Sequence, residues 1–161
     1  MVIGDWITLT ALIIALTLGV WALVQANRMQ KRQYKHLLIN EIIDWATEIM
    51  KSTRIENIPI IGSSDLETAR RRVLGNKYFQ LYALDAKTNY MKGIAAFFPR
   101  MSNKTSEVES NLNELSRVFF EAVDRREDQF EDAVAPYFRR VDRSAQELIE
   151  LAIQAKTEEL S

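Results

Sequence analysis

One uncharged run near the N-terminus constrains this chain more than any other feature of its sequence. The nineteen residues from Trp6 to Val24 contain no charged side chain. A helix rises about 1.5 Å per residue, so the run spans roughly 28 Å, close to the thickness of a bilayer's hydrocarbon core. Trp6 and Trp21 lie near its two ends, where indole rings prefer the membrane interface. The run therefore predicts a single N-terminal transmembrane helix.

The alternative to a permanent anchor is an export signal that is cut off. Cleaved signals begin with positive charge and have an apolar core of about 7–15 residues. The first five residues here include Asp5 and no Lys or Arg, and the apolar run is longer. Val24-Gln25-Ala26 resembles a cleavage site, but the other features favour an uncleaved signal-anchor over residues 1–25.

The charges that flank the run predict its orientation. Four basic residues follow the run closely, and none precedes it: Arg28, Lys31, Arg32 and Lys35. Positive charge is retained on the cytoplasmic side of a bacterial-type inner membrane. We therefore expect a single-pass cell inner membrane protein with its N-terminus outside and residues 26–161 in the cytoplasm.

Small residues recur every four positions within the run, at Ala11, Ala15 and Gly19. This spacing places them on one helix face, and such faces let two membrane helices approach closely. The pattern predicts pairing of the membrane helix with a second copy. The alternative is a lone helix surrounded by lipid.

After the anchor, apolar residues recur at helical spacing over four segments, approximately 26–53, 65–98, 106–134 and 136–158. Pro59 and Gly62 mark the first connection, and Pro99 is expected to end the second segment before a loop that runs to Ser106. Pro136 indicates either a kink in one long C-terminal helix or the start of a new one. The predicted fold is all-α, with the transmembrane helix followed by an antiparallel bundle of three to four helices in residues 26–161. In the alternative architecture, the apolar stripe of 106–158 pairs between chains as a coiled coil.

The sequence contains few residue types suited to catalysis or metal binding. It has no Cys, which excludes thiolate sites, and its one histidine is His36, which cannot complete a two-histidine metal site. The acidic residues between Glu121 and Asp132 and the basic triplet Arg70–Arg72 are typical of solvated, ion-paired helix faces. We predict no catalytic residue, no metal and no cofactor. The net charge of −1 also argues against nucleic-acid binding.

The segment after the second predicted helix combines large apolar and basic residues: Phe97, Phe98, Arg100, Met101 and Lys104. This composition is typical of contact with an anionic membrane interface. The lengths of the first two predicted helices also return this segment to the membrane side of an antiparallel bundle. We expect it to form a membrane-interface loop. The alternative is a loop that folds over the end of its own bundle.

These features favour a non-enzymatic, membrane-anchored helical scaffold that holds an unidentified protein partner, or further copies of itself, at the cytoplasmic membrane face. Membrane lipid is then a second partner. An alternative is a regulatory or sensor subunit that signals through a dimeric membrane helix. An enzyme whose residues form no recognisable motif is the least favoured interpretation.

Overall fold

Helices account for nearly all of the chain that the structure describes. The structure, a computed structural model, describes the backbone of residues 3–53, 65–124 and 130–158, and the side chains of residues 13–53, 75–77, 79–122 and 132–158. The helices are α1 (Ile3–Thr53), α2 (Asp65–Ala95), α3 (Pro99–Asp124) and α4 (Phe130–Glu158), and these ranges contain no strand. The predicted all-α fold is thereby confirmed. The chain divides into two units, Met1–Leu37 and Leu38–Ser161, each described here by itself.

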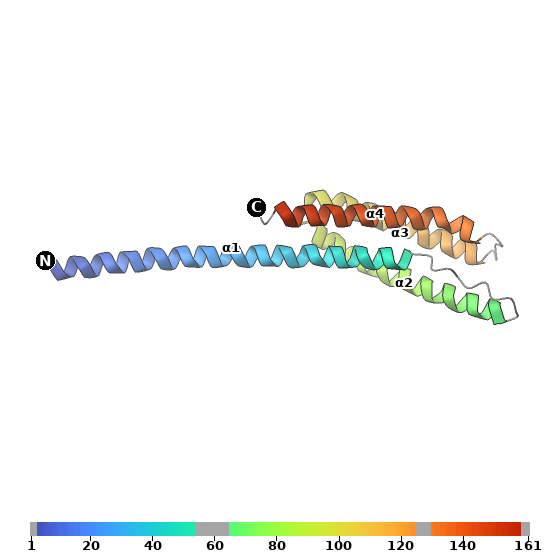
Figure 1. The fold of residues 1–161 in the computed structure, drawn as a ribbon, viewed down its shortest axis with the longest axis horizontal. Coiled ribbons are helices and arrows are strands. Elements are labelled where there is room, and N and C mark those ends of the chain that lie inside the picture. Colours follow the sequence, from blue (N-terminus) through green and yellow to red (C-terminus); the bar gives the residue numbers. More distant parts are fainter. Residues whose placement is uncertain (1–2, 54–64, 125–129, 159–161) are drawn as a thin grey trace. The chain divides into compact units, whose positions relative to one another are not determined.

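The second unit is an antiparallel helical bundle built from the C-terminal part of α1 and from α2, α3 and α4 (Figure 1). Interhelical contacts give the order of the helices. Tyr90 of α2 donates a hydrogen bond to Glu41 of α1, and Lys87 pairs with Glu48. At one end of the bundle, Lys156 near the end of α4 donates to Asn40 of α1. Each helix therefore runs against the direction of the one before it, as short connections favour.

Apolar residues from all four helices form the core of this bundle. The stripe predicted on the first soluble helix is buried: Trp45 is 1% exposed, and Ile42 and Ile49 are fully buried. The Trp45 indole also donates a hydrogen bond of 3.3 Å to the carbonyl of Leu84, which satisfies its N–H inside the core. Apolar residues of the second predicted helix are buried as well: Leu81, Leu84, Met91 and Ala95 on α2, and Phe98 in the turn that follows it.

The connection between α2 and α3 differs from the predicted loop. Only Ala96, Phe97 and Phe98 separate the two helices, and the chain is helical again from Pro99. Proline is well suited to the first position of a helix, where its missing N–H would have no partner. The Phe98 carbonyl accepts hydrogen bonds from the amides of Met101 and Ser102, which begins the helix. The prediction was wrong here because Pro99 was interpreted only as the end of one helix and not as the start of the next.

In the C-terminal half, α3 and α4 bury their apolar residues against each other within a single chain. Val108, Leu112 and Leu115 of α3 are fully buried, as are Val141 and Leu148 of α4. The rings of Phe119 and Phe138 meet edge to face with centroids 6.4 Å apart. The stripe considered for a coiled coil between chains is therefore core of the bundle. Pro136 lies inside α4, which begins six residues earlier at Phe130.

The first unit, Met1–Leu37, consists of the N-terminal part of α1. Every described residue from Ile13 to Val24 is exposed, including Trp21 at 63% and Leu23 at 73%. The side chains of Trp6 and Ala11, which enter the predictions above, lie outside the described residues. In the part of the chain that the structure describes, no helix combines the length and the apolar character needed to cross a membrane.

The burial of Trp45 leads to a prediction about stability. Replacing Trp45 by Ala should lower the free energy of unfolding by about 3–5 kcal/mol, because the change opens a cavity and leaves the Leu84 carbonyl without its donor. Chemical unfolding of the detergent-solubilised chain, followed by circular dichroism, measures this loss. Trp21→Ala is the matched control, since Trp21 is exposed and should leave the bundle's unfolding unchanged. Equal unfolding curves for the two variants would contradict the core described here.

Candidate functional site

The described side chains contain no cluster of three or more residues able to hold a metal ion. Residues 38–161 contain no histidine, because His36 is the only one in the chain. The hydroxyl of Ser116 is buried and has no hydrogen-bond partner among the described atoms. A serine nucleophile needs an adjacent base, and no histidine of this unit can serve as one. The remaining candidates for a site are polar contacts between helices and exposed surfaces.

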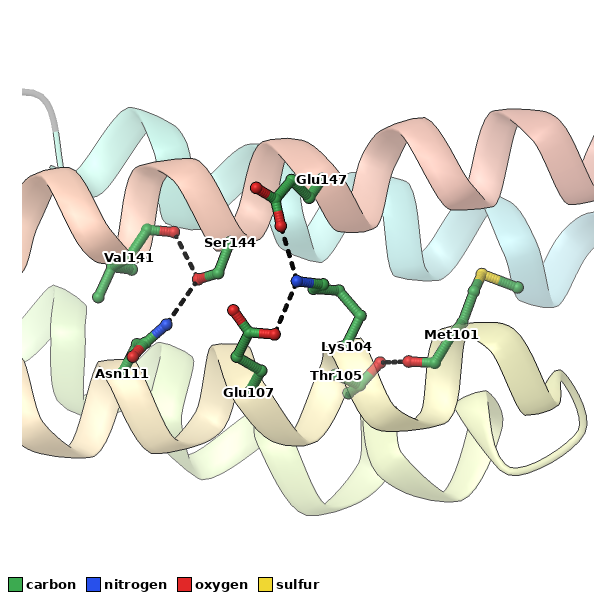
Figure 2. Close-up of polar contacts among 8 residues, drawn as sticks. All are labelled: Met101, Lys104, Thr105, Glu107, Asn111, Val141, Ser144 and Glu147. Carbon is green, nitrogen blue, oxygen red and sulfur yellow. Dashed lines mark hydrogen bonds and ion pairs between the residues drawn. The ribbon is translucent and has the colours of Figure 1, made fainter.

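The most connected polar group of the bundle lies between α3 and α4 (Figure 2). The ammonium of Lys104 is 2.6 Å from Glu107 on its own helix and 2.6 Å from Glu147 on α4. Figure 2 shows Lys104 reaching across the seam between the two helices. Hydrogen bonds to Glu107 and Glu147 raise the pKa of the Lys104 ammonium. The hydrogen bond from Lys104 likewise lowers the pKa of the Glu147 carboxyl.

A second polar contact crosses the same seam. The amide of Asn111 donates to the hydroxyl of Ser144, and this hydroxyl donates in turn to the carbonyl of Val141 (Figure 2). Arg140 also pairs with Glu114 at 2.7 Å. Every group in these contacts has a partner within the chain. Their arrangement aligns α3 with α4, and it leaves no open ligand position.

The residues predicted for a membrane-interface loop do not share one surface. Phe97 is 71% exposed, but Phe98 is only 8% exposed and Met101 is fully buried. Arg100 pairs with Glu158 at the end of α4, and Lys104 takes part in the contacts described above. Phe98 and Met101 therefore belong to the core of the bundle. The apolar spacing of α3 continues back to Met101, which explains why this residue joins the core.

Two of the three predicted helix-packing residues, Ala15 and Gly19, are exposed on α1, and the side chain of Ala11 lies outside the described residues. Ala15 and Gly19 line a shallow depression together with Leu16, Val20 and Leu23. A side chain added at Gly19 would meet nothing within 4 Å. The four basic residues predicted to determine topology are all exposed on α1: Arg28, Lys31, Arg32 and Lys35.

An exposed surface of α2 and of the turn that follows it was not predicted from the sequence. Eight aromatic or small residues form this surface, which we call the aromatic face: Phe79, Tyr82, Ala83, Ala86, Tyr90, Gly93, Ala96 and Phe97. Its four aromatic side chains are 59–71% exposed. They recur at helical spacing beside the buried stripe of the same helix. The face was missed because aromatic residues at this spacing usually belong to a core.

Charge is nearly absent from this face and common elsewhere on the bundle. Of the twelve residues between Asn76 and Phe97 whose described side chains are exposed, only Lys87 is charged, and it pairs with Glu48 at 3.0 Å. On α4, by comparison, six of the eleven exposed side chains among residues 132–158 are charged. Protein interfaces are enriched in Tyr and Phe and depleted of Lys, Glu and Asp at their centres. The aromatic face has this composition, whereas the exposed surface of α4 does not.

An acidic residue lies at the edge of the aromatic face, on the side of α3. Burial raises the pKa of the Asp85 carboxyl, and the nearby charge of Glu109 raises it further. Glu109 itself pairs with Lys92 at 2.9 Å. These contacts join α2 to α3 and place the charged groups beside the face rather than on it.

Comparison with known proteins assigns no family to this chain. It matches no family model, no curated protein and no solved structure. Function is therefore argued from the bundle and its surfaces alone.

The contact between Lys104 and Glu147 predicts how stability depends on pH. Because the folded pKa of Glu147 lies below its usual 4.5, the pair stabilises the fold above that pH and loses its effect as the pH falls through the folded pKa. Glu147→Gln should therefore destabilise the bundle at neutral pH, and the difference from the natural chain should shrink in acid. Urea unfolding at a series of pH values measures the difference.

Glu150→Gln is the matched control for this series, because Glu150 is exposed and accepts a hydrogen bond from the neutral Gln146 of its own helix. A loss for Glu147→Gln that stays constant from neutral to acid pH would contradict the assigned ion pair.

Proposed function

We propose that this protein is a non-enzymatic, membrane-anchored helical module that binds a protein partner at the cytoplasmic face of the cell membrane. Residues 1–25 serve as the anchor, and the bundle of residues 38–161 carries the binding surface. The aromatic face of α2 is the observation that supports this proposal most strongly.

The aromatic face differs from the surrounding surface in the amount of apolar side chain that it exposes. Phe79 and Phe97 are each 71% exposed, although burying a large aromatic ring is favourable by about 1.5–3 kcal/mol. The bundle has buried other rings of this kind, such as Phe119 at 2%. An apolar surface left outside a well-packed core marks an interaction site more often than a solvated face does.

The sequence supports the anchor. The uncharged run from Trp6 to Val24 has the length of a membrane span, and basic residues follow it on one side only. The exposure of every residue from Ile13 to Val24 agrees with this proposal, because lipid would cover apolar side chains on all sides of the helix.

The depression at Ala15 and Gly19 favours a second candidate function. Two membrane helices that meet through this face would make the protein a regulatory or sensor subunit, in which the state of the bundle is transmitted through the paired anchors. This function also uses the bundle as a binding module, and it differs in requiring the anchors to pair.

The anchor leads to a direct prediction. The full chain should remain with membranes after a high-salt or alkaline wash and should be released by detergent. Leu16→Arg should lower the membrane-bound fraction, because a charge near the middle of the span costs about 2.5–3.5 kcal/mol on insertion scales. A reporter that is active only in the cytoplasm should be active when fused after Ser161.

Gln25→Arg is the matched control, because the same charge is then placed at the cytoplasmic end of the run and should leave the membrane-bound fraction unchanged. Recovery of the natural chain in the soluble fraction without detergent would overturn the anchor. Activity of a reporter that functions only outside the cytoplasm would overturn the orientation.

A further inference from the structure

We propose that the partner bound by the aromatic face is a second copy of this chain, aligned antiparallel along α2. This inference rests on the proposed function and deepens it, because it names the partner of the same surface. Three features of the face support this partner: the order of large and small residues along it, its area, and the absence of charge from its eight residues.

The order of residue sizes makes the face complementary to itself. From Phe79 to Phe97 the sizes run large, large, small, small, large, small, small, large. When one copy is reversed, its Ala86 lies opposite Tyr90 of the other copy, and its Ala83 lies opposite Gly93. In this register, the numbers of two opposed residues add up to 176. Tyr82 then lies near Ala96, so each tyrosine meets an alanine, and Phe79 meets Phe97 at each end.

A parallel pair has no such match. Each residue then faces its own copy, so tyrosine opposes tyrosine while Gly93 opposes Gly93. The rings would hold the helices apart where the small residues need them close. Both arrangements are isologous, with a two-fold axis, and the antiparallel register is the one that fills the gap between the helices.

Gly93 provides a further argument for close approach. Glycine inside a helix is less favourable than alanine by about 1 kcal/mol. The bundle itself does not require a glycine here, because an added side chain would meet nothing within 4 Å. A second helix packed at Ala83 and Gly93 explains the glycine, since small residues let two helix backbones approach closely.

The area of the face suits a weak, specific dimer. Aromatic side chains bury about 150–250 Å² each, so four rings exposed to about two thirds offer on the order of 500 Å² per copy. Two copies then bury on the order of 1,000 Å² before the small residues are counted, and specific interfaces begin near about 1,200 Å².

The charges around the face are compatible with self-pairing. In the antiparallel register, Lys87 lies opposite the neutral Asn89 of the second copy, so no like charges meet. Lys87 keeps its contact with Glu48 on the α1 side of the same chain. A strongly acidic or basic partner would need complementary charge on this face, but none of its eight residues is charged, and the one exposed charged residue described beside it is Lys87.

Cysteine cross-linking tests both the partner and the alignment, because the natural chain contains no cysteine. Ala83→Cys and Gly93→Cys are made in full-length chains with different tags and are oxidised in membranes, separately and together. In the proposed register, the cysteine that replaces Ala83 in one copy faces the cysteine that replaces Gly93 in the other. When both copies carry the same variant, the two cysteines are offset by ten residues, or about 15 Å along the helix axis. A disulfide can join Cα atoms no more than ~7 Å apart, so these cysteines should not react with each other.

The expected result is a disulfide-linked dimer that carries both tags when the two variants are mixed and little product from either variant alone. Asn113→Cys, an exposed position on α3, is the control and should not cross-link. Dimers from Ala83→Cys alone and Gly93→Cys alone would overturn the antiparallel alignment. Absence of the mixed product, or a product with a different protein, would overturn self-pairing.

A charge variant gives a second measurement that does not depend on oxidation. Ala86 is exposed, so Ala86→Glu should leave the thermal unfolding of the bundle unchanged and weaken dimerisation in detergent at least about ten-fold, because a buried interface tolerates an unpaired charge poorly. Asn113→Glu is the control on α3. Equal dimer fractions for the two variants would contradict the proposal.

The outcomes separate this inference from the proposed function. A chain that stays with membranes but gives no mixed product leaves the anchored module standing and removes the second copy as its partner. A chain that is soluble yet gives the mixed product removes the anchor and keeps the self-pairing.

Discussion

The packing of the C-terminal part of α1 against α2 is the interaction on which the rest of the bundle depends. Trp45 lies at its centre, almost fully buried, and its indole donates to the carbonyl of Leu84. This contact turns Leu81, Leu84 and Met91 of α2 toward the core. A helix has only one such side, so the rings of Tyr82 and Tyr90 must face outward. The aromatic face is thus a consequence of how α2 is held by α1.

The other side of the bundle is stabilised differently. Apolar contacts join α3 and α4 in the core, and polar contacts at the edge align them, with Lys104 bound to both Glu107 and Glu147. The exposed surface of α4 is rich in charge, which keeps it hydrated. Among the α2 side chains that the structure describes from residue 75 onward, Lys87 is the single exposed charged residue. This difference between two sides of one bundle is the physical basis for the proposed binding surface.

Much of the fold could be predicted from the spacing of apolar residues. The stripe around Trp45 and the stripes of α3 and α4 are core, as expected, because helical periodicity reports burial directly. The turn at Phe97 could not be predicted in the same way. Proline both ends and begins helices, and only the hydrogen bonds to the Phe98 carbonyl show that α3 starts at once. Ser106, at which the predicted loop was expected to end, lies well inside that helix.

The candidate site was harder to predict than the fold. On α2, aromatic residues are interleaved with the aliphatic residues that form the core. The sequence alone therefore does not distinguish a buried aromatic ring from one exposed on the surface. Tyr90 shows the difficulty: its hydroxyl bonds to Glu41 while its ring remains 59% exposed. The predicted anchor, by contrast, depends on the composition and length of one run and needs no tertiary information.

The central claim is that the aromatic face is covered in the working protein. The most direct test compares the rates at which a membrane-impermeant thiol reagent modifies a cysteine at Ala86 and one at Asn113, in the full chain within inside-out membrane vesicles. Both positions are exposed in the single chain, so equal accessibility is expected if nothing binds. The account predicts modification at Ala86 at least about ten-fold slower than at Asn113, with the rates becoming equal after unfolding in denaturant, because bound protein excludes reagent and solvent from an interface centre. Equal rates in native membranes would show that the face is open to water and would contradict the proposed function.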